Sequence, residues 1–143
     1  MTLVKPYALP ISLEFFDLGH VYASHYLIKE GLLEAPYHYG FVLNVPGAVP
    51  YSVENLSAFM KALPAGADYT VMGIGRSSLP AQFGAMANGG WIRVGFEDNV
   101  YFSKGVLATN NAQLVERAAR IAHEGGLKTA TPDEVRQYLK LRG

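Results

Sequence analysis

Residues 89–99 read Gly-Gly-Trp-Ile-Arg-Val-Gly-Phe-Glu-Asp-Asn, and this stretch decides the fold. After the two glycines, apolar residues alternate with others, which predicts a strand. Arg93 and Glu97 lie on one face of that strand, and the opposite face carries Ile92, Val94 and Phe96. The apolar face must pack on another layer, so the charged face enters an interior or a cleft. Because buried charges cost several kcal/mol unless they are paired or bind a metal, the stretch is typical of an active-site strand.

The composition bounds the class of protein. The chain has 143 residues, 50% of them hydrophobic, which predicts one folded domain over residues 1–143. A net charge of zero gives no indication of a nucleic-acid partner. The absence of cysteine excludes disulfides, thiolate metal sites and a cysteine nucleophile. No apolar run approaches the ~20 residues of a membrane span, and residues 1–10 lack the pattern of a signal peptide. We therefore expect a cytoplasmic protein without a membrane partner.

Strand and helix patterns alternate along the chain. Strands are expected at 11–17, at 37–45, at 69–72 within the segment 68–75, and at 89–99. Helices are expected at 20–30, 52–63, 79–88 and 110–124, followed by a capping box at 131–134 that opens a last helix to about 141. This alternation implies an α/β fold with parallel strands and right-handed crossovers. An open doubly wound sheet is the rival fold, but it usually has a glycine-rich turn after its first strand, and residues 17–20 are not such a turn.

Four strand–helix units amount to half of a TIM (β/α)8 barrel. Polar residues on the expected strands, such as Ser12, Glu14 and Asn44, fit a barrel whose lumen holds function. Half a barrel leaves two unpaired edges and a lumen without its opposite wall. We therefore expect the other half to come from another chain or segment, from a symmetric copy in a homo-oligomer, or from a rearranged packing.

Glu97 is a candidate metal ligand. A catalytic zinc site normally uses three protein ligands, and none of the four histidines of the chain forms a His-x-His or His-x-x-x-His pair with another. A complete metal site is therefore not visible in this sequence. The alternative for Glu97 is a buried ion pair with an arginine.

Arg93 and Asp98 are the other candidates on this strand. An arginine that faces the interior can bind a carboxylate through two hydrogen bonds, and Glu14 on the first strand is its natural partner. A structural Glu14–Arg93 pair is the alternative to a catalytic one. Asp98 lies at the junction between strand and loop, where catalytic side chains of barrels emerge, and could act as a general base.

The loop at residues 73–78, Gly-Ile-Gly-Arg-Ser-Ser, follows the third strand and precedes a helix. Loops of this kind can bind phosphate through backbone N–H groups, and Arg76 would suit a phosphate or pyrophosphate. An ordinary glycine turn with a helix cap is the alternative.

Several of these segments together resemble one family, the zinc-dependent β-keto acid cleavage enzymes. The matching segments run through the chain in order and are residues 13–20, 40–47, 73–76, 89–90 with 93–99, 108–116 and 130–134. The most specific of them is the block from Arg93 to Asn99. The chain departs from the family at Trp91, where members often have His or Asn, and a tryptophan there would reshape the pocket.

The resemblance implies the C-terminal half of an eight-unit barrel that condenses a β-keto acid with acetyl-CoA, giving acetoacetate and a new CoA thioester. It also implies a Zn²⁺ ion held by a His-x-His pair from the N-terminal half and by the glutamate that Glu97 matches. Asp98 matches the aspartate that deprotonates the substrate, Arg93 the arginine that works with it, and Glu14 a supporting carboxylate. In such a mechanism zinc polarises the keto oxygen while a carboxylate takes the proton.

Three hypotheses follow from the sequence. In the first, the chain is the C-terminal half of such an enzyme and works with an N-terminal half-barrel that carries His-x-His. In the second, it is a non-catalytic half-barrel that associates with itself. In the third, it is a phosphate- or nucleotide-binding module built around residues 73–77, with Arg76 as the anion ligand.

Overall fold

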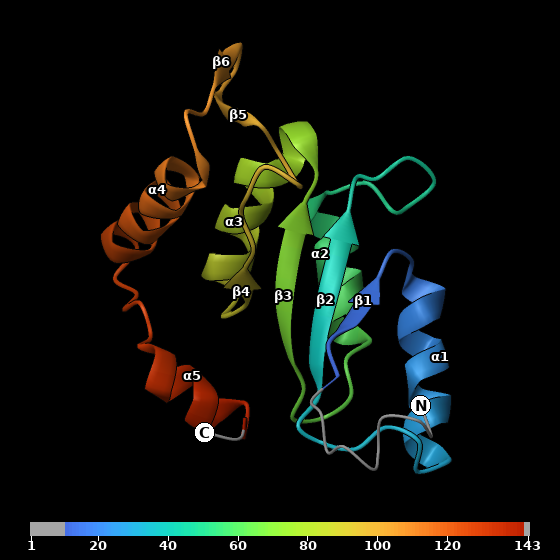
Figure 1. The fold of residues 1–143 in the computed structure, drawn as a ribbon. Coiled ribbons are helices and arrows are strands. Elements are labelled where there is room, and N and C mark those ends of the chain that lie inside the picture. Colours follow the sequence, from blue (N-terminus) through green and yellow to red (C-terminus); the bar gives the residue numbers. More distant parts are fainter. Residues whose placement is uncertain (1–10, 142–143) are drawn as a thin grey trace.

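The computed structural model describes residues 11–141 and has an α/β fold (Figure 1). Its elements occur in the order β1 (Leu13–Phe15), α1 (Leu18–Lys29), β2 (His38–Leu43), α2 (Val53–Lys61), β3 (Asp68–Gly73), a 3-10 turn (Gly75–Ser77), α3 (Ser78–Ala87), β4 (Trp91–Ile92), β5 (Tyr101–Ser103), β6 (Val106–Leu107), α4 (Asn111–Glu124) and α5 (Pro132–Tyr138). The expected alternation of strands and helices is confirmed.

Strands β1 to β4 form one parallel sheet in the order of the sequence, as expected. Glu14, Gly40, Thr70 and Trp91 are paired side by side across the four strands. The side chains of paired residues lie on the same face of the sheet, as do those of residues two positions apart on one strand. We call the face that carries these residues the polar face.

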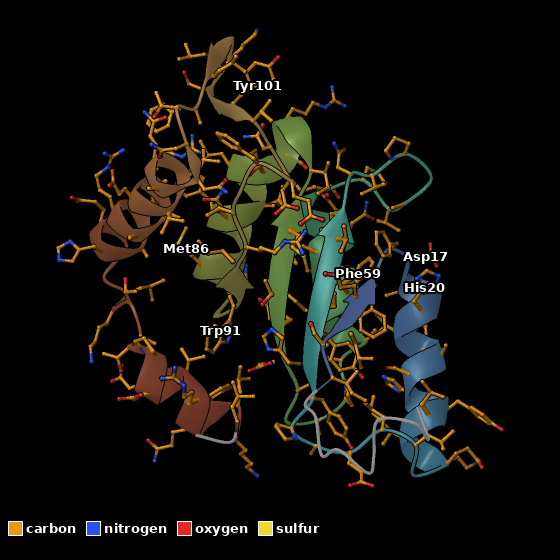
Figure 2. The ribbon with its side chains drawn as sticks, in the orientation of Figure 1. Asp17, His20, Phe59, Met86, Trp91 and Tyr101 are labelled. Atoms are coloured by element: carbon orange, nitrogen blue, oxygen red, sulfur yellow. The ribbon has the colours of Figure 1, made fainter. Side chains whose placement is uncertain are left out.

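Helices α1, α2 and α3 pack against the opposite face. At its centre the ring of Phe41 lies 4.9 Å from that of Phe59 on α2 and 5.3 Å from that of Tyr69 on β3, measured between centroids. Val21 of α1 and Ala85 of α3 complete the same buried cluster. Figure 2 shows Phe59 between α2 and the sheet. A single core on one face leaves the polar face to carry chemistry.

Polar side chains cap the starts of three helices. Ser52 accepts a hydrogen bond from the backbone of Asn55 at the start of α2, and Asn110 caps α4. At α5, Thr131 and Glu134 form the expected capping box. Side-chain oxygens satisfy backbone N–H groups that have no partner within the helix.

The first and second strands are shorter than their patterns predict, whereas the third strand contains the predicted residues 69–72. Asp17, assigned to the first strand, instead caps α1 and accepts from the N–H of Gly19 at 2.7 Å. The strand therefore ends at Phe15, and the helix begins at Leu18. The third strand ends at Gly73, where the 3-10 turn follows.

The fourth strand departs most from its pattern, and the expectation that it continues to Glu97 was wrong. Only Trp91 and Ile92 belong to β4, although the N–H of Arg93 still donates to Val71 on β3 at 3.3 Å. At Gly95 φ is +157°, a conformation that glycine adopts readily. The N–H groups of Asp98 and Asn99 both donate to the Gly95 carbonyl, at 3.1 and 3.0 Å, and close a turn.

A short antiparallel hairpin, β5–β6, follows this turn and was not anticipated. Arg117 of α4 holds it, donating a hydrogen bond to the carbonyl of Phe102 while its guanidinium lies 4.9 Å from the centre of the Phe102 ring. Burial, and to a smaller extent the charge of Arg120, lowers the pKa of Arg117. Tyr101 marks the hairpin in Figure 2.

Within residues 11–141, no helix has the length and apolar character that crossing a membrane requires.

Candidate active site

Four charged side chains meet beyond the end of β4. Arg93 is one of them and contacts the other three. Its Nε and Nη2 atoms donate to the two carboxylate oxygens of Asp98 at 3.0 and 2.6 Å. Its Nη1 atom donates to Oε1 of Glu14 on β1 at 3.1 Å, and Nη2 lies 3.6 Å from Oε2 of Glu97. The expected Glu14–Arg93 pair is therefore present, and the structure brings together four of the five predicted site residues.

The turn at residues 95–99 buries Asp98 and exposes Glu97, the reverse of what a continuous strand would do. The side chain of Asp98 is 2% exposed and that of Glu97 is 85% exposed. The backbone also fixes Asp98, because its carbonyl accepts from the N–H of Gly75 at 2.8 Å. The hydrogen bonds from Arg93 to Asp98 raise the pKa of the guanidinium, so Arg93 stays charged.

The cluster carries an excess of negative charge. Three carboxylates, those of Glu14, Glu97 and Asp98, surround one guanidinium, which leaves two negative charges uncompensated. Such an excess attracts a cation. Among residues 11–141, no three histidine or carboxylate side chains gather closely enough to hold a metal ion. Glu97 has an exposed carboxylate and fits as one ligand, but the described residues do not complete a site.

A pocket of about 270 Å³ lies on the polar face next to this cluster. Its lining includes Glu14 and Arg93 together with Ser12, His38, Thr70 and Met72. The charged cluster therefore opens onto a space that can admit a small molecule.

His38 connects two residues of β3 at the floor of this pocket. Its Nδ1 atom hydrogen-bonds the carboxylate of Asp68, and its Nε2 atom lies 2.8 Å from the hydroxyl of Thr70. We did not single out these three residues from the sequence. The signal was available, because His38, Asp68 and Thr70 occupy polar positions in otherwise apolar strands.

Arg76 lies apart from the network of ion pairs, and it is exposed. The loop around it uses its backbone groups internally. The N–H of Gly75 donates to Asp98, and that of Ser77 donates to the carbonyl of Ile74 at 3.4 Å. Asn44 also donates to Ile74, at 3.1 Å. These bonds anchor the loop against the charged cluster. The role of Arg76 as an anion ligand stays a prediction.

Comparison with known proteins agrees with this arrangement. The sequence model of the β-keto acid cleavage enzyme family matches residues 1–141. The chain is 44% identical over 140 residues to a 3-keto-5-aminohexanoate cleavage enzyme of Fusobacterium nucleatum, which covers 97% of this chain and 48% of that protein.

The names of two further relatives include acetyl-CoA as co-substrate. A 3-dehydrocarnitine:acetyl-CoA trimethylamine transferase of Rhizobium meliloti is 38% identical over 129 residues, covering 90% of this chain and 43% of the relative. A 3-oxoadipate:acetyl-CoA acetyltransferase of Cupriavidus necator is 33% identical over 141 residues, covering 96% of this chain and 50% of the relative. The chain thus spans about half the length of the relatives it matches. On this evidence the chain belongs to the β-keto acid cleavage enzyme family, whose named members are enzymes.

Proposed function

We propose that this chain supplies the C-terminal half of the active site of a zinc-dependent enzyme that exchanges acyl groups between a β-keto acid and acetyl-CoA. The observation that carries the proposal is the cluster in which Arg93 binds Asp98 and Glu14 while Glu97 stays exposed beside it. It stands at the end of a parallel sheet, in a chain of a family with such activities.

The proposed architecture is half of a (β/α)8 barrel. Sequential parallel strands support it, as do helices confined to one face of the sheet, because a barrel carries its helices on the outside and closes around the other face. The outer strands β1 and β4 would pair with strands from the part of the relatives that this chain does not match.

Asp98 is the proposed general base. It would take a proton from the carbon between the keto and carboxylate groups of the substrate, so that a C–H bond breaks and an O–H bond forms on Asp98. A carboxylate has about four acceptor positions, so the two hydrogen bonds from Arg93 fix its orientation and leave lone pairs for the substrate. Burial of Asp98 excludes water from the base.

Arg93 and Glu14 would hold that base in place. Arg93 bridges the two carboxylates, and this bridge resists rotation of Asp98 as it gains and loses the proton. Glu97 would be one zinc ligand, with a His-x-His pair from the other half as the remaining protein ligands. Zinc, when bound, would polarise the keto oxygen of the substrate.

Native mass spectrometry tests the architecture. We would measure the chain alone and after co-expression with the part of the Fusobacterium relative that it does not match. The proposal expects a complex of both pieces that contains zinc. A metal-free oligomer of this chain that does not bind the other piece would contradict the proposal and would favour a self-associating half-barrel.

The same complex tests the chemistry. We expect acetyl-CoA-dependent formation of acetoacetate from 3-keto-5-aminohexanoate, the compound named for the Fusobacterium relative. Asp98→Asn should lower turnover by about a hundredfold or more, as removal of a general base does, with little change in zinc content. Asp133→Asn, at an exposed carboxylate on α5, is the control. Unchanged turnover in Asp98→Asn would rule out the general base.

A further inference from the structure

The hydrogen bonds around His38 give the hydroxyl of Thr70 a defined role. The carboxylate of Asp68 accepts from Nδ1–H of His38, so in the neutral ring Nε2 has the free lone pair. That atom accepts the hydroxyl proton of Thr70 at 2.8 Å. The Thr70 oxygen then keeps its own lone pairs and is an acceptor toward the pocket that it lines.

The neighbouring register positions place a second acceptor across a gap. Glu14, Gly40 and Thr70 occupy one level on three adjacent strands, and Gly40 has no side chain to separate the other two. A Cβ atom at Gly40 would lie 2.6 Å from Cε of Met72, 3.2 Å from the carbonyl oxygen of Leu13 and 3.5 Å from Cγ of Glu14. The end of the Met72 side chain thus fills the space above Gly40, and this flexible side chain can move aside for a ligand.

The distance from this gap to the reacting groups suits a short carbon chain. Thr70 pairs with Trp91, and Arg93 follows two residues later on the same face. Two residues of a strand span about 6.6 Å. A substrate whose keto group lies near Arg93 and Asp98 can therefore reach Thr70 with a chain of a few carbon atoms.

Further contacts hold Asp68 in place behind His38. Tyr138 of α5 hydrogen-bonds Asp68, which raises the pKa of the phenol, and its ring lies 5.6 Å from that of Trp91. Figure 2 shows Trp91 on the side of β4 that faces α5. The ring of Trp91 also meets that of His38 edge-on at 5.9 Å. His38 is thus oriented from two sides, and the direction of the Thr70 hydroxyl is fixed.

We propose that Thr70, oriented by His38 and Asp68, forms with Glu14 a subsite for a hydrogen-bond donor on the chain of the β-keto acid, either a hydroxyl or an ammonium group. This subsite rests on the proposed function for its substrate class. It selects β-keto acids with a donor at the far end over purely aliphatic ones, because both facing groups are acceptors. A terminal carboxylate is disfavoured, since it would face Glu14 without a donor between them.

Two probes of equal chain length test the subsite, 5-hydroxy-3-oxohexanoate and 3-oxohexanoate. Binding is measured first on the 143-residue chain, from the NMR signals of the His38 ring and the Thr70 methyl group. We expect the hydroxylated probe to bind about tenfold more tightly and to shift both signals, as one well-placed hydrogen bond would give. Thr70→Val should abolish the difference, whereas Thr129→Val should preserve it. Equal affinities in the parent chain would overturn the subsite, with or without turnover.

Kinetics of the two-piece complex give the second readout. Thr70→Val should raise KM for the hydroxylated probe about tenfold and leave kcat, and both constants for 3-oxohexanoate, within about threefold. Asp68→Asn should have the same selective effect, because an amide that donates to Nδ1 reverses the tautomer of His38 and removes the acceptor from Thr70. Equal losses on both probes would indicate a structural role and contradict the proposal. A binding difference without turnover would contradict only the proposed enzymatic function.

Discussion

Arg93 binds both carboxylate oxygens of Asp98, and the two residues differ sharply in their exposure to solvent. The side chain of Arg93 is 36% exposed, whereas that of Asp98 is 2% exposed. The arginine thus forms the solvent side of the pair and compensates the charge of a buried carboxylate. Removal of the guanidinium would leave this buried carboxylate without its ion-pair partner.

Arg93→Met should therefore destabilise the chain. A buried carboxylate would lose its partner, which costs on the order of 2–4 kcal/mol in the free energy of unfolding. Arg136→Met is the matched control, because Arg136 forms an exposed pair with Asp133 on α5 and such pairs contribute less than about 1 kcal/mol. Urea unfolding of the 143-residue chain measures both. Similar losses in the two variants would show that the Arg93–Asp98 pair does not stabilise the fold.

Glu97→Gln separates metal binding from folding. The exposed side chain of Glu97 makes one long contact, 3.6 Å to Arg93, so the midpoint of thermal unfolding of the chain should not change. In the two-piece complex the same substitution should lower zinc affinity by about tenfold or more, because an amide is a weaker ligand than a carboxylate. Metal analysis after dialysis against a zinc buffer measures this affinity, with Glu124→Gln on α4 as control. Equal zinc occupancy in mutant and parent would exclude Glu97 as a ligand.

Local rules predicted most of the fold. The capping residues Ser52, Asn110 and Thr131 each accept a hydrogen bond from a backbone N–H three residues later in the chain. Such bonds depend only on the local sequence. The fourth strand was misjudged because alternation measures only the side-chain pattern. Gly95 allows the backbone to turn, and the carbonyl of Gly95 then accepts two N–H groups that a strand would have offered to a neighbour.

The site was predictable where it depends on the sheet and not where it depends on the turn. Alternation placed Glu14 and Arg93 on one face, and they pair across the sheet. The exposure of Glu97 and the burial of Asp98 follow from the turn, so the pattern gave them in reverse. His38 and Asp68 are visible as polar residues in apolar strands, but their pairing depends on the register between β2 and β3, which one sequence does not reveal.

Gly73→Ala should be strongly destabilising. Gly73 ends β3 where the chain turns toward α3, and a Cβ there would lie 2.5 Å from the carbonyl oxygen of Ser77 and 2.6 Å from Cβ of Ala81. Because backbone atoms cannot move aside cheaply, we expect a loss of about 1–3 kcal/mol in the free energy of unfolding. At Gly125 the nearest atoms would lie 3.4 Å away, so Gly125→Ala should be tolerated. Equal urea midpoints for the two variants would contradict the close contact at Gly73.

The capping box of α5 should give the helix a pH dependence in the acid range. Oε2 of Glu134 accepts from the N–H of Thr131 at 2.7 Å, and Oε1 accepts from Lys128 at 3.0 Å. These hydrogen bonds, that of the Thr131 backbone foremost, lower the pKa of Glu134. A carboxyl whose pKa is lowered in the folded state stabilises that state above its unfolded pKa, and the contribution is lost as the pH falls through the folded value.

The amide NMR signals of residues 132–138 should therefore lose their helical shifts as the pH falls below about 4. Glu134→Gln supplies the control, because glutamine can accept the same hydrogen bond from Thr131 without titrating. In that variant the α5 signals should respond less to pH over the same range than in the parent, while signals of α2, whose Glu54 also has a lowered pKa, should still titrate. If α5 responded to acid equally in the parent and in Glu134→Gln, the pH dependence would have a source other than Glu134.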